Sequence, residues 1–299
     1  MYTSGGDGIS AVEPRRFRLN RRPEERVHLL GAVMDLVRSE EVFHFVSGKI
    51  AARQSAIVAN HNLHSLYLIR KNPRIAEFYK AADLVEVDSA PLLLWARIVG
   101  RSSRRFHRCT YLDWRDDFWA LAVERNWKVF FVGGAPGVGE TAVEAIRQDW
   151  PEARIATHHG YFDATSGSTE NQAVVEAIQT YAPDVVLVGM GMPRQEIWTL
   201  DNYKAFGPAV SFTVGGAFDY EAGVQHAAPR WMGQMGVEWL FRLMADPRRL
   251  FSRYCVEPWS LVIPALNDLR RSLDRKPTAP RLAKAVEPIA RPEVLSGHS

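Results

Sequence analysis

The stretch KVFFVGG at residues 128–134 decides the fold of this sequence. Its first five residues form a short, nearly continuous apolar run, which predicts a buried strand, and the two glycines predict a tight turn. The stretch that follows, residues 138–149, has the pattern of a helix. Buried strands that alternate with helices indicate a parallel sheet covered on both faces.

The same alternation recurs along the chain. Further strands are expected at Ala56–Ala59, Leu84–Val87, Arg154–Thr157, Asp184–Val188 and Ala209–Val214, with helical stretches between them. The last third reads as helices without strands. We predict an α/β fold, with a Rossmann-like, mostly parallel sheet, helices on both faces and a helical C-terminal appendage. The expected organisation is a disordered or loosely attached segment 1–25, an α/β domain 26–229, the appendage 230–275 and a disordered tail 276–299.

Composition and charge restrict the location and the partners of the protein. The chain has 299 residues, 46% of them hydrophobic, and only two cysteines, so we expect free thiols in a reducing compartment. We expect neither a signal peptide nor a spanning helix, because the sequence has no N-terminal apolar stretch and no apolar run of about 18 residues. A cytoplasmic protein with at most peripheral membrane contact is expected. The net charge of +3 is concentrated between Arg242 and Lys284, which suggests phosphates or acidic lipid as partners, or only a solvated tail. No nucleic-acid partner is expected.

Three of the predicted strands end in glycine. Gly133 and Gly134 lead into a helix, where backbone N–H groups are available to a phosphate, although a tight turn without a ligand has the same pattern. Gly189 and Gly191 precede Arg194, Gln195 and Glu196, which together suit phosphate and sugar hydroxyls or a uracil edge. Gly215 and Gly216 precede Asp219, a candidate ligand of a hydroxyl.

Asp88 ends another predicted strand and is a candidate general base. Asp before Ser-x-Pro is also a common turn initiator, so the residues alone leave both interpretations open.

These motifs, in this order, resemble the WecG/TagA/CpsF family of glycosyltransferases over residues 56–253. The most specific part is G-M-P-R-Q-E at residues 191–196 followed by E-W-L-F-R-L at residues 238–243. The other shared segments are Asn62, Asn72-Pro73, Ala82–Val85 with Asp88, Arg108 with Asp113, Phe131–Gly134, Gly160–Phe162, Gly215–Asp219, Gly223 and Pro247–Arg249.

The resemblance implies a metal-independent, inverting enzyme without a cofactor. It would transfer a sugar from a UDP-sugar to a polyprenyl-pyrophosphate-linked saccharide of a bacterial cell-surface polysaccharide. Asp88 matches the carboxylate proposed as catalytic base, and Asn62 and Gln195 match residues of the same pocket. Arginines thought to reach the donor diphosphate match Arg242, Arg249 and, more loosely, Arg253. The other donor- or acceptor-binding candidates are Asn60, Arg108, Asp113, Gly133, Gly134, Tyr161, Gly189, Gly191, Arg194, Glu196, Gly215, Gly216 and Asp219.

No metal ligand set is expected, because there is no DxD-like aspartate pair and no His/Cys cluster. Arginine would then stabilise the leaving diphosphate, as Mg²⁺ does elsewhere. Self-association into a homo-oligomer stays open.

The sequence departs from the family pattern at four positions. Ser89 follows the base where glycine is usual, Asn60 replaces a common threonine, Tyr111 replaces a glycine and Ala227 replaces an arginine, for which His226 or Arg230 are the candidates to compensate. A subgroup with another donor or acceptor is therefore expected, and N-acetylmannosamine should not be assumed.

Two alternative functions compete with this enzyme. A nicotinamide-dependent oxidoreductase would share the glycine-rich turns, but no acidic residue follows at a second strand end about 20 residues on. A non-enzymatic nucleotide-sugar-binding component of an assembly complex stays open because of the altered base motif and the lost arginine.

The appendage mixes aromatic and aliphatic side chains with arginine, which suits a helix in a membrane interface. Packing onto the core is the favoured interpretation for Trp239–Leu243. A membrane contact is favoured for Trp259–Ile263, between Pro258 and Pro264.

Overall fold

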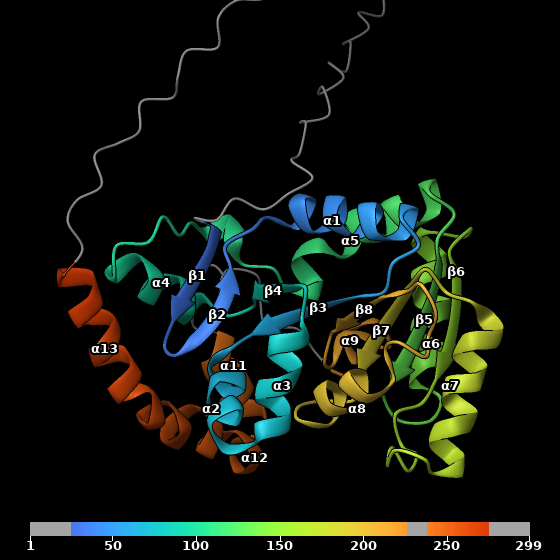
Figure 1. The fold of residues 1–299 in the computed structure, drawn as a ribbon. Helices are drawn as coiled ribbons and strands as arrows, with labels where there is room; N and C mark the ends of the chain where they lie inside the picture. Colours follow the sequence, from blue (N-terminus) through green and yellow to red (C-terminus); the bar gives the residue numbers. More distant parts are fainter. Residues whose placement is uncertain (1–24, 226–231, 233–237, 275–299) are drawn as a thin grey trace, which may run out of the picture.

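The computed structural model describes residues 25–225, 232 and 238–274. A six-stranded sheet forms the centre, with the strands in the order β4-β3-β8-β7-β5-β6, all parallel (Figure 1). These strands are β3 (Ala56–His61), β4 (Leu84–Val87), β5 (Lys128–Gly133), β6 (Arg154–His158), β7 (Val185–Gly189) and β8 (Val210–Thr213). Each of them was predicted, and the α/β fold with a parallel sheet is confirmed.

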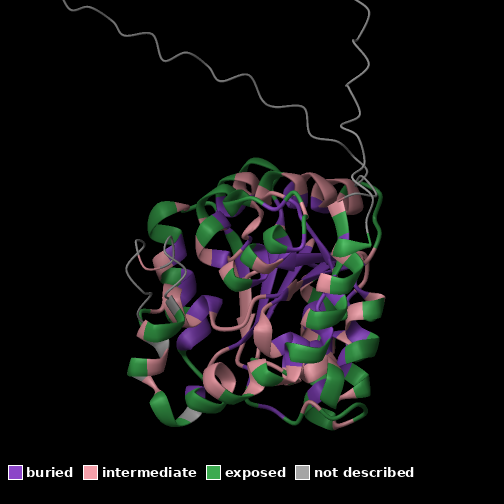
Figure 2. Cartoon of the chain, turned by 90° about the vertical axis from the view of Figure 1, so that its left-hand side faces the viewer, coloured by how far each residue is buried: buried purple, intermediate pink, exposed green. Residues whose placement is uncertain are grey.

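Helices cover both faces of this sheet. One face carries α1 (Ser39–Ala51), α5 (Tyr111–Glu124), α6 (Val138–Asp149) and α9 (Ala217–Glu221). The other face carries α3 (Pro73–Ala81), α7 (Thr169–Tyr181) and α8 (Arg194–Asn202). The strands are buried between these layers, and the exposed residues lie on the outer surfaces of the helices (Figure 2).

Aromatic packing fixes the first of these faces. Phe118 and Trp119 of α5 are fully buried, and Trp114 packs edge-on against Phe118 at 5.4 Å between ring centroids. At the other end, Phe131 of β5 stacks on Phe218 of α9 at 3.6 Å. This stack fixes α9 close to the carboxyl end of β5.

An N-terminal hairpin was not predicted from the sequence. Strands β1 (Arg26–Leu29) and β2 (Ala32–Asp35) pair antiparallel, and helices α2 (Leu63–Lys71) and α4 (Ala90–Ile98) contribute to the same hydrophobic cluster. Asp35 is fully buried and accepts hydrogen bonds from Arg26 and from the backbone N–H of Val85 at 2.9 Å. The carboxylate thus satisfies a donor of β4, which is an edge strand of the main sheet.

The C-terminal appendage is helical throughout its described part, as predicted. It consists of α11 (Glu238–Ala245), α12 (Pro247–Phe251), η3 (Ser252–Val256), η4 (Glu257–Leu261) and α13 (Val262–Leu273). Leu261 is buried in the cluster that the hairpin forms with α2 and α4. Asp268 Oδ2 accepts from the backbone N–H of Leu30 at 2.7 Å and from the Trp95 indole at 3.1 Å. The end of the appendage is therefore attached to the N-terminal hairpin.

Candidate functional site

The carboxyl ends of the six parallel strands lie along one edge of the sheet. Ligands of open α/β sheets bind at this edge. Asp88 follows β4, Asn62 follows β3, Gly191–Glu196 follows β7 and Gly215 follows β8. The fold therefore brings together residues that lie far apart in the sequence.

Asp88 and Asn62 are neighbours across β4 and β3. The backbone N–H of Asp88 donates to the carbonyl of His61 at 2.9 Å, and the Asp88 side chain is half-buried. Asn62 Oδ1 accepts from the N–H of Ser65 and caps α2, while its Nδ2 lies 4.0 Å from Sδ of Met192. The Asn62 amide thus lies between the Asp88 strand and the turn after β7.

Asn60, two residues before Asn62, joins β3 to β8. Its Nδ2 donates to the backbone carbonyl of Thr213 at 2.7 Å, and the backbone carbonyl of Asn60 accepts from the hydroxyl of Tyr79 at 2.9 Å. The bond to Thr213 gives the Asn60 side-chain amide a structural role between β3 and β8.

Gln195 and Glu196 begin α8 and are both buried. Gln195 Oε1 accepts from the backbone N–H of Gly215 at 3.1 Å, and its Nε2 donates to Glu196 Oε1 at 2.7 Å. The turn before them contains a cis Met192–Pro193 peptide. The ends of β7 and β8 are therefore connected through the Gln195 side chain.

Arg194 points toward the loop after β6. Its guanidinium donates to the carbonyl of Phe162 and lies 5.4 Å from the centre of that ring. The neighbouring Tyr161 is 72% exposed. Arg194 is thus held by Phe162, and the ring of the preceding residue, Tyr161, is open to solvent.

Glycine is favoured at the strand ends for two different physical reasons. An added Cβ at Gly133 would come within 2.3 Å of the carbonyl oxygen of Gly189, and one at Gly189 within 2.5 Å of that of Gly215. Close approach of β5, β7 and β8 alone therefore requires glycine at these two positions. Gly134 and Gly191 have positive φ values of 66° and 75°, which favour glycine, and at Gly191 an added Cβ would meet open space.

Asp219 lies over two of the glycine turns. Its carboxylate oxygens are 3.7 Å and 3.0 Å from the Cβ positions that side chains would occupy at Gly134 and Gly216. Burial raises the pKa of Asp219. The Asp219 carboxylate thus faces the space at the ends of β5 and β8, where a hydroxyl could donate to it.

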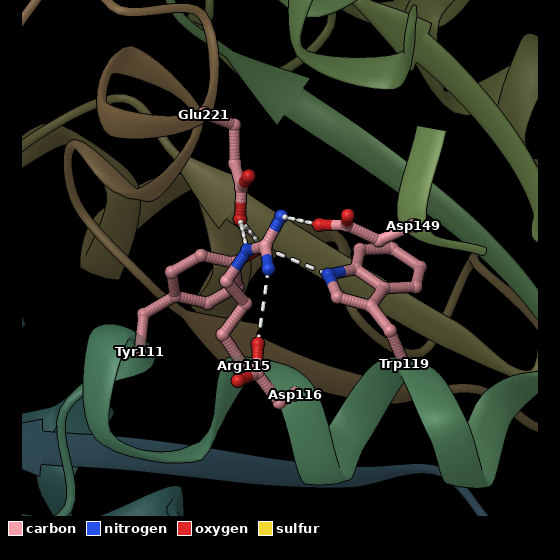
Figure 3. A network of polar contacts seen from close by, with 6 residues as sticks. All are labelled: Tyr111, Arg115, Asp116, Trp119, Asp149 and Glu221. Carbon is pink, nitrogen blue, oxygen red and sulfur yellow. Dashed lines mark hydrogen bonds and ion pairs between the residues drawn. The ribbon is translucent and has the colours of Figure 1, made fainter. Parts of the chain in front are cut away.

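A buried polar network holds the helix that carries Asp219 (Figure 3). Glu221 of α9 accepts from the hydroxyl of Tyr111 at 2.7 Å and from Nε of Arg115 at 2.6 Å. The Tyr111 hydroxyl accepts from the Trp119 indole at 2.9 Å, and Arg115 also pairs with Asp149 at 3.1 Å. Tyr111, which stands where the family pattern has glycine, therefore connects α5 to α9.

Arg108 and Asp113 lie beside the end of β4. Arg108 forms an isolated parallel bridge with Val87, and its Nε lies 3.5 Å from Asp113 Oδ2. Asp113 also accepts from the hydroxyl of Thr110 at 2.8 Å. The pair is thus adjacent to the strand that carries Asp88.

The appendage approaches the site through η3 and η4. Arg253 of η3 is near enough to Glu196 and to His64 to affect both of their pKa values. Glu257 of η4 pairs with Nδ1 of His64 at 2.5 Å. Arg242 and Arg249 belong to α11 and α12, but their side chains lie outside the described residues.

Sequence reasoning missed two groups beneath the site. His61 is fully buried, stacks on Tyr79 at 4.0 Å and has its pKa lowered by burial to about 3. Glu86 is buried under Asp88, and burial together with the Asp88 charge raises its pKa well above the usual range. The polar run Asn60-His61-Asn62 at a strand end could have indicated the histidine.

Two further features bear on ligands and membranes. Within the described residues, no group of three or more His, Cys, Asp or Glu side chains is arranged to hold a metal ion. In the same part of the chain, every helix is too short or too polar to cross a membrane.

Comparison with known proteins places this chain among glycosyl transferases. The family described as glycosyl transferase WecG/TagA/CpsF matches residues 27–275. Two proteins of Staphylococcus aureus, from strains MRSA252 and NCTC 8325, are each 30% identical over 200 residues, which is 64% of this chain and 77% of the relative. Both are named N-acetylglucosaminyldiphosphoundecaprenol N-acetyl-beta-D-mannosaminyltransferase. Because the family match spans most of the sequence, this chain belongs to the WecG/TagA/CpsF family of glycosyl transferases.

Proposed function

We propose that this enzyme is an inverting transferase that moves a sugar from a UDP-sugar to a polyprenyl-pyrophosphate-linked saccharide in the synthesis of a bacterial cell-surface polysaccharide. The names of the Staphylococcus aureus relatives, whose acceptor is a diphosphoundecaprenol-linked N-acetylglucosamine, support the lipid-linked acceptor. Membership of a glycosyltransferase family argues against both a nicotinamide-dependent oxidoreductase and a non-enzymatic scaffold.

The observation that carries the proposal is the position of Asp88. The carboxylate is half-buried at the end of β4, and Asn62 and the turn after β7 lie next to it. Asp219 faces the glycine turns of β5 and β8, farther along the same edge. This edge therefore has one carboxylate, Asp88, that can accept a proton, and a second, Asp219, that can accept hydrogen bonds from hydroxyls of the donor.

Inversion requires one displacement at the anomeric carbon. Asp88 would accept the proton of the acceptor hydroxyl, and the hydroxyl oxygen would form its bond to the anomeric carbon on the face opposite UDP. The bond from that carbon to the β-phosphate oxygen breaks, and its electron pair leaves with UDP. Arg253, together with Arg242 and Arg249, is proposed to stabilise the departing diphosphate.

A lipid-linked acceptor would also give the appendage a reason to contact the membrane. Trp259 is 75% exposed and Ile263 is 67% exposed, and Leu266 and Val262 are exposed on the same helical segment. Arg270 and Arg271 follow on α13. We propose that this surface rests on the anionic inner face of the cell membrane, where the lipid-linked acceptor is found.

A donor screen tests the proposed function. The full-length protein is incubated with a short-chain lipid pyrophosphate saccharide and a panel of UDP-sugars, including UDP-N-acetylmannosamine, and UDP release is measured. We expect acceptor-dependent release with at least one donor and none when the acceptor is omitted. Absence of release with the whole panel, while UDP still binds, would contradict the proposed acceptor class.

A further inference from the structure

Helix α4 is apolar on two sides, although one of these sides is exposed. Its inner side chains belong to the hydrophobic cluster of the N-terminal hairpin, and these are Leu92, Leu93, Ala96 and Val99. Leu94 and Ile98 lie one turn apart on the opposite side and are 56% and 58% exposed. A surface helix normally has a polar outer side, and a helix that is apolar all round is normally covered. The outer side of α4 is therefore a candidate contact surface.

Positive charge surrounds these two side chains. Residues 89–112, which include α4 and the short helix η2 (Arg105–His107), contain five arginines and no Asp or Glu. Three of the arginines are exposed, and within the described part of the chain none of these three forms an ion pair: Arg97, Arg104 and Arg105. From another part of the chain, Glu25 approaches this region near His107. The surface thus carries an excess of positive charge.

The loop after α4 is fixed to α4 and to β4. Ser103 is buried, and its hydroxyl donates to the carbonyl of Leu93 at 2.8 Å. The backbone N–H of Cys109 donates to a carbonyl of β4 at 2.9 Å. Between these two points η2 packs on α4, and Phe106 is 48% exposed, with the guanidinium of Arg38 4.0 Å from the centre of its ring. The outer side of α4 and the residues of η2 therefore form one preformed surface.

This surface starts directly after the candidate base. Ser89 follows Asp88 and is the N-cap residue of α4. The bond from the Trp95 indole to Asp268 joins α4 to α13, and both helices lie at the same end of the molecule (Figure 1). A membrane at that end is therefore close to α4, to α13 and to the strand end that carries Asp88.

The chemistry of the surface favours an anionic lipid bilayer over other partners. Apolar and aromatic side chains mixed with arginine fit the boundary between acyl chains and headgroup phosphates. A nucleic acid would pair with the arginines but would leave Leu94 and Ile98 uncovered. A second copy of the chain, related by a twofold axis, would place Arg97 and Arg105 near the same arginines of the first copy.

We propose that α4 and η2 form a lipid-binding surface, separate from that of α13, which rests on anionic phospholipid and holds the strand end of Asp88 at the membrane. We call it the α4–η2 surface, and its members are Leu94, Arg97, Ile98, Arg104, Arg105 and Phe106. The purpose of this contact rests on the proposed function. A polyprenyl-linked acceptor keeps its lipid in the bilayer, so the base has to meet the acceptor hydroxyl close to the headgroups.

Vesicle binding tests this surface without an assay of activity. Full-length wild type, Arg97→Gln/Arg105→Gln and Leu94→Ser/Ile98→Ser are sedimented with vesicles of phosphatidylglycerol or of phosphatidylcholine. Each arginine near an anionic surface contributes about fivefold to binding, so the arginine variant should bind phosphatidylglycerol about 25-fold more weakly at low salt. The apolar variant should bind about tenfold more weakly, with little dependence of this loss on salt.

A matched control removes the same charge elsewhere. Arg53 and Arg125 are exposed and precede β3 and β5, at the amino ends of the strands. Arg53→Gln/Arg125→Gln should therefore bind phosphatidylglycerol as wild type does. Equal binding by wild type and both α4–η2 variants would overturn the proposal, as would failure of wild type to bind phosphatidylglycerol. A dimeric wild type that Leu94→Ser/Ile98→Ser converts to a monomer, without loss of vesicle binding, would assign the surface to a second copy and also overturn it.

UDP release separates this inference from the proposed function. Arg97→Gln/Arg105→Gln should release UDP at the wild-type rate with a short-chain acceptor in solution, and more slowly than wild type with a long-chain acceptor in phosphatidylglycerol vesicles. Equally slow release in solution would place the arginines in the reaction itself and overturn a purely lipid-binding role. Absence of release by wild type with both acceptors would refute the proposed function, while the vesicle measurements would still decide whether the α4–η2 surface binds lipid.

Discussion

Replacing Glu196 with Gln should remove a large part of the pH dependence of folding stability. In the folded protein burial raises the pKa of Glu196 from 4.5 to about 7, so the folded state holds this proton more tightly than the unfolded chain does. The resulting stabilisation is fully present below pH 4.5, and it is lost as pH rises through about 7. Each pH unit between the two pKa values is worth about 1.36 kcal/mol, so the total is about 3 kcal/mol.

Urea unfolding of both proteins between pH 4.5 and pH 8 measures this effect. The quantity to compare is the free energy of unfolding of Glu196→Gln minus that of wild type at each pH. Glu86 and Asp219, whose pKa values are also raised by burial, are present in both proteins and cancel in the difference. We expect the difference to increase by about 3 kcal/mol across the range. A difference that stays constant within about 0.5 kcal/mol would refute the assignment of a raised pKa to Glu196.

The remaining predictions concern the base, the metal, the membrane surface and the Tyr111 network. Asp88→Asn should lower kcat by about 10²–10⁴-fold with little change in UDP affinity, and near wild-type turnover would remove Asp88 from the mechanism. Activity should survive EDTA, because arginines are proposed to stabilise the leaving group; loss on chelation with recovery on adding Mg²⁺ or Mn²⁺ would contradict this. The double variant Trp259→Ser/Ile263→Ser should sediment less with anionic vesicles than wild type does. The control Val224→Ser, which changes an exposed apolar residue after α9, should bind as wild type does. Equal binding by wild type and both variants would exclude the α13 surface as the anchor. Tyr111→Phe leaves the Trp119 indole without its partner and should lower the free energy of unfolding by about 1–3 kcal/mol, and an unchanged urea midpoint would show that the network does not hold α9.

The sheet was predictable from the sequence because its central strands are short apolar runs. KVFFV and DVVLV have the composition of strands that are buried on both faces, and both are found there. The hairpin of β1 and β2 was not predicted from the sequence, because each strand has only four residues. Its burial also depends on α4 and α13, which are distant in the sequence.

The site was predictable in position but not in the role of each residue. Asp88 could be placed at a strand end from local pattern alone. Gly133 and Gly189, in contrast, look like ligand-binding glycines until the close approach of their own strands is seen. Arg194 suggested a phosphate ligand, but the fold brings Phe162 to its guanidinium. Glu196 was a candidate ligand of donor or acceptor hydroxyls in the sequence, and the fold buries it because the first turn of α8 faces the sheet.

The appendage combines the two interpretations that the sequence offered. Leu261 is buried in the hairpin cluster, while Trp259 and Ile263 on either side of it are exposed. Trp239 and Leu240, for which packing onto the core was favoured, are exposed, and Trp239 contacts Tyr254 within the appendage. The helical pattern of residues 259–263, between Pro258 and Pro264, did not indicate which of these side chains would be buried.

The bond from Leu30 to Asp268 joins residues 238 positions apart, and this separation has a consequence for how the chain is made. A ribosome delivers the hairpin well before α13, so the Leu30 amide and the Trp95 indole lack their acceptor until α13 has been synthesised. Closing so long a loop late makes docking of the appendage one of the last steps of folding. Arg253 precedes α13 in the appendage, so the position of this arginine depends on the same docking step.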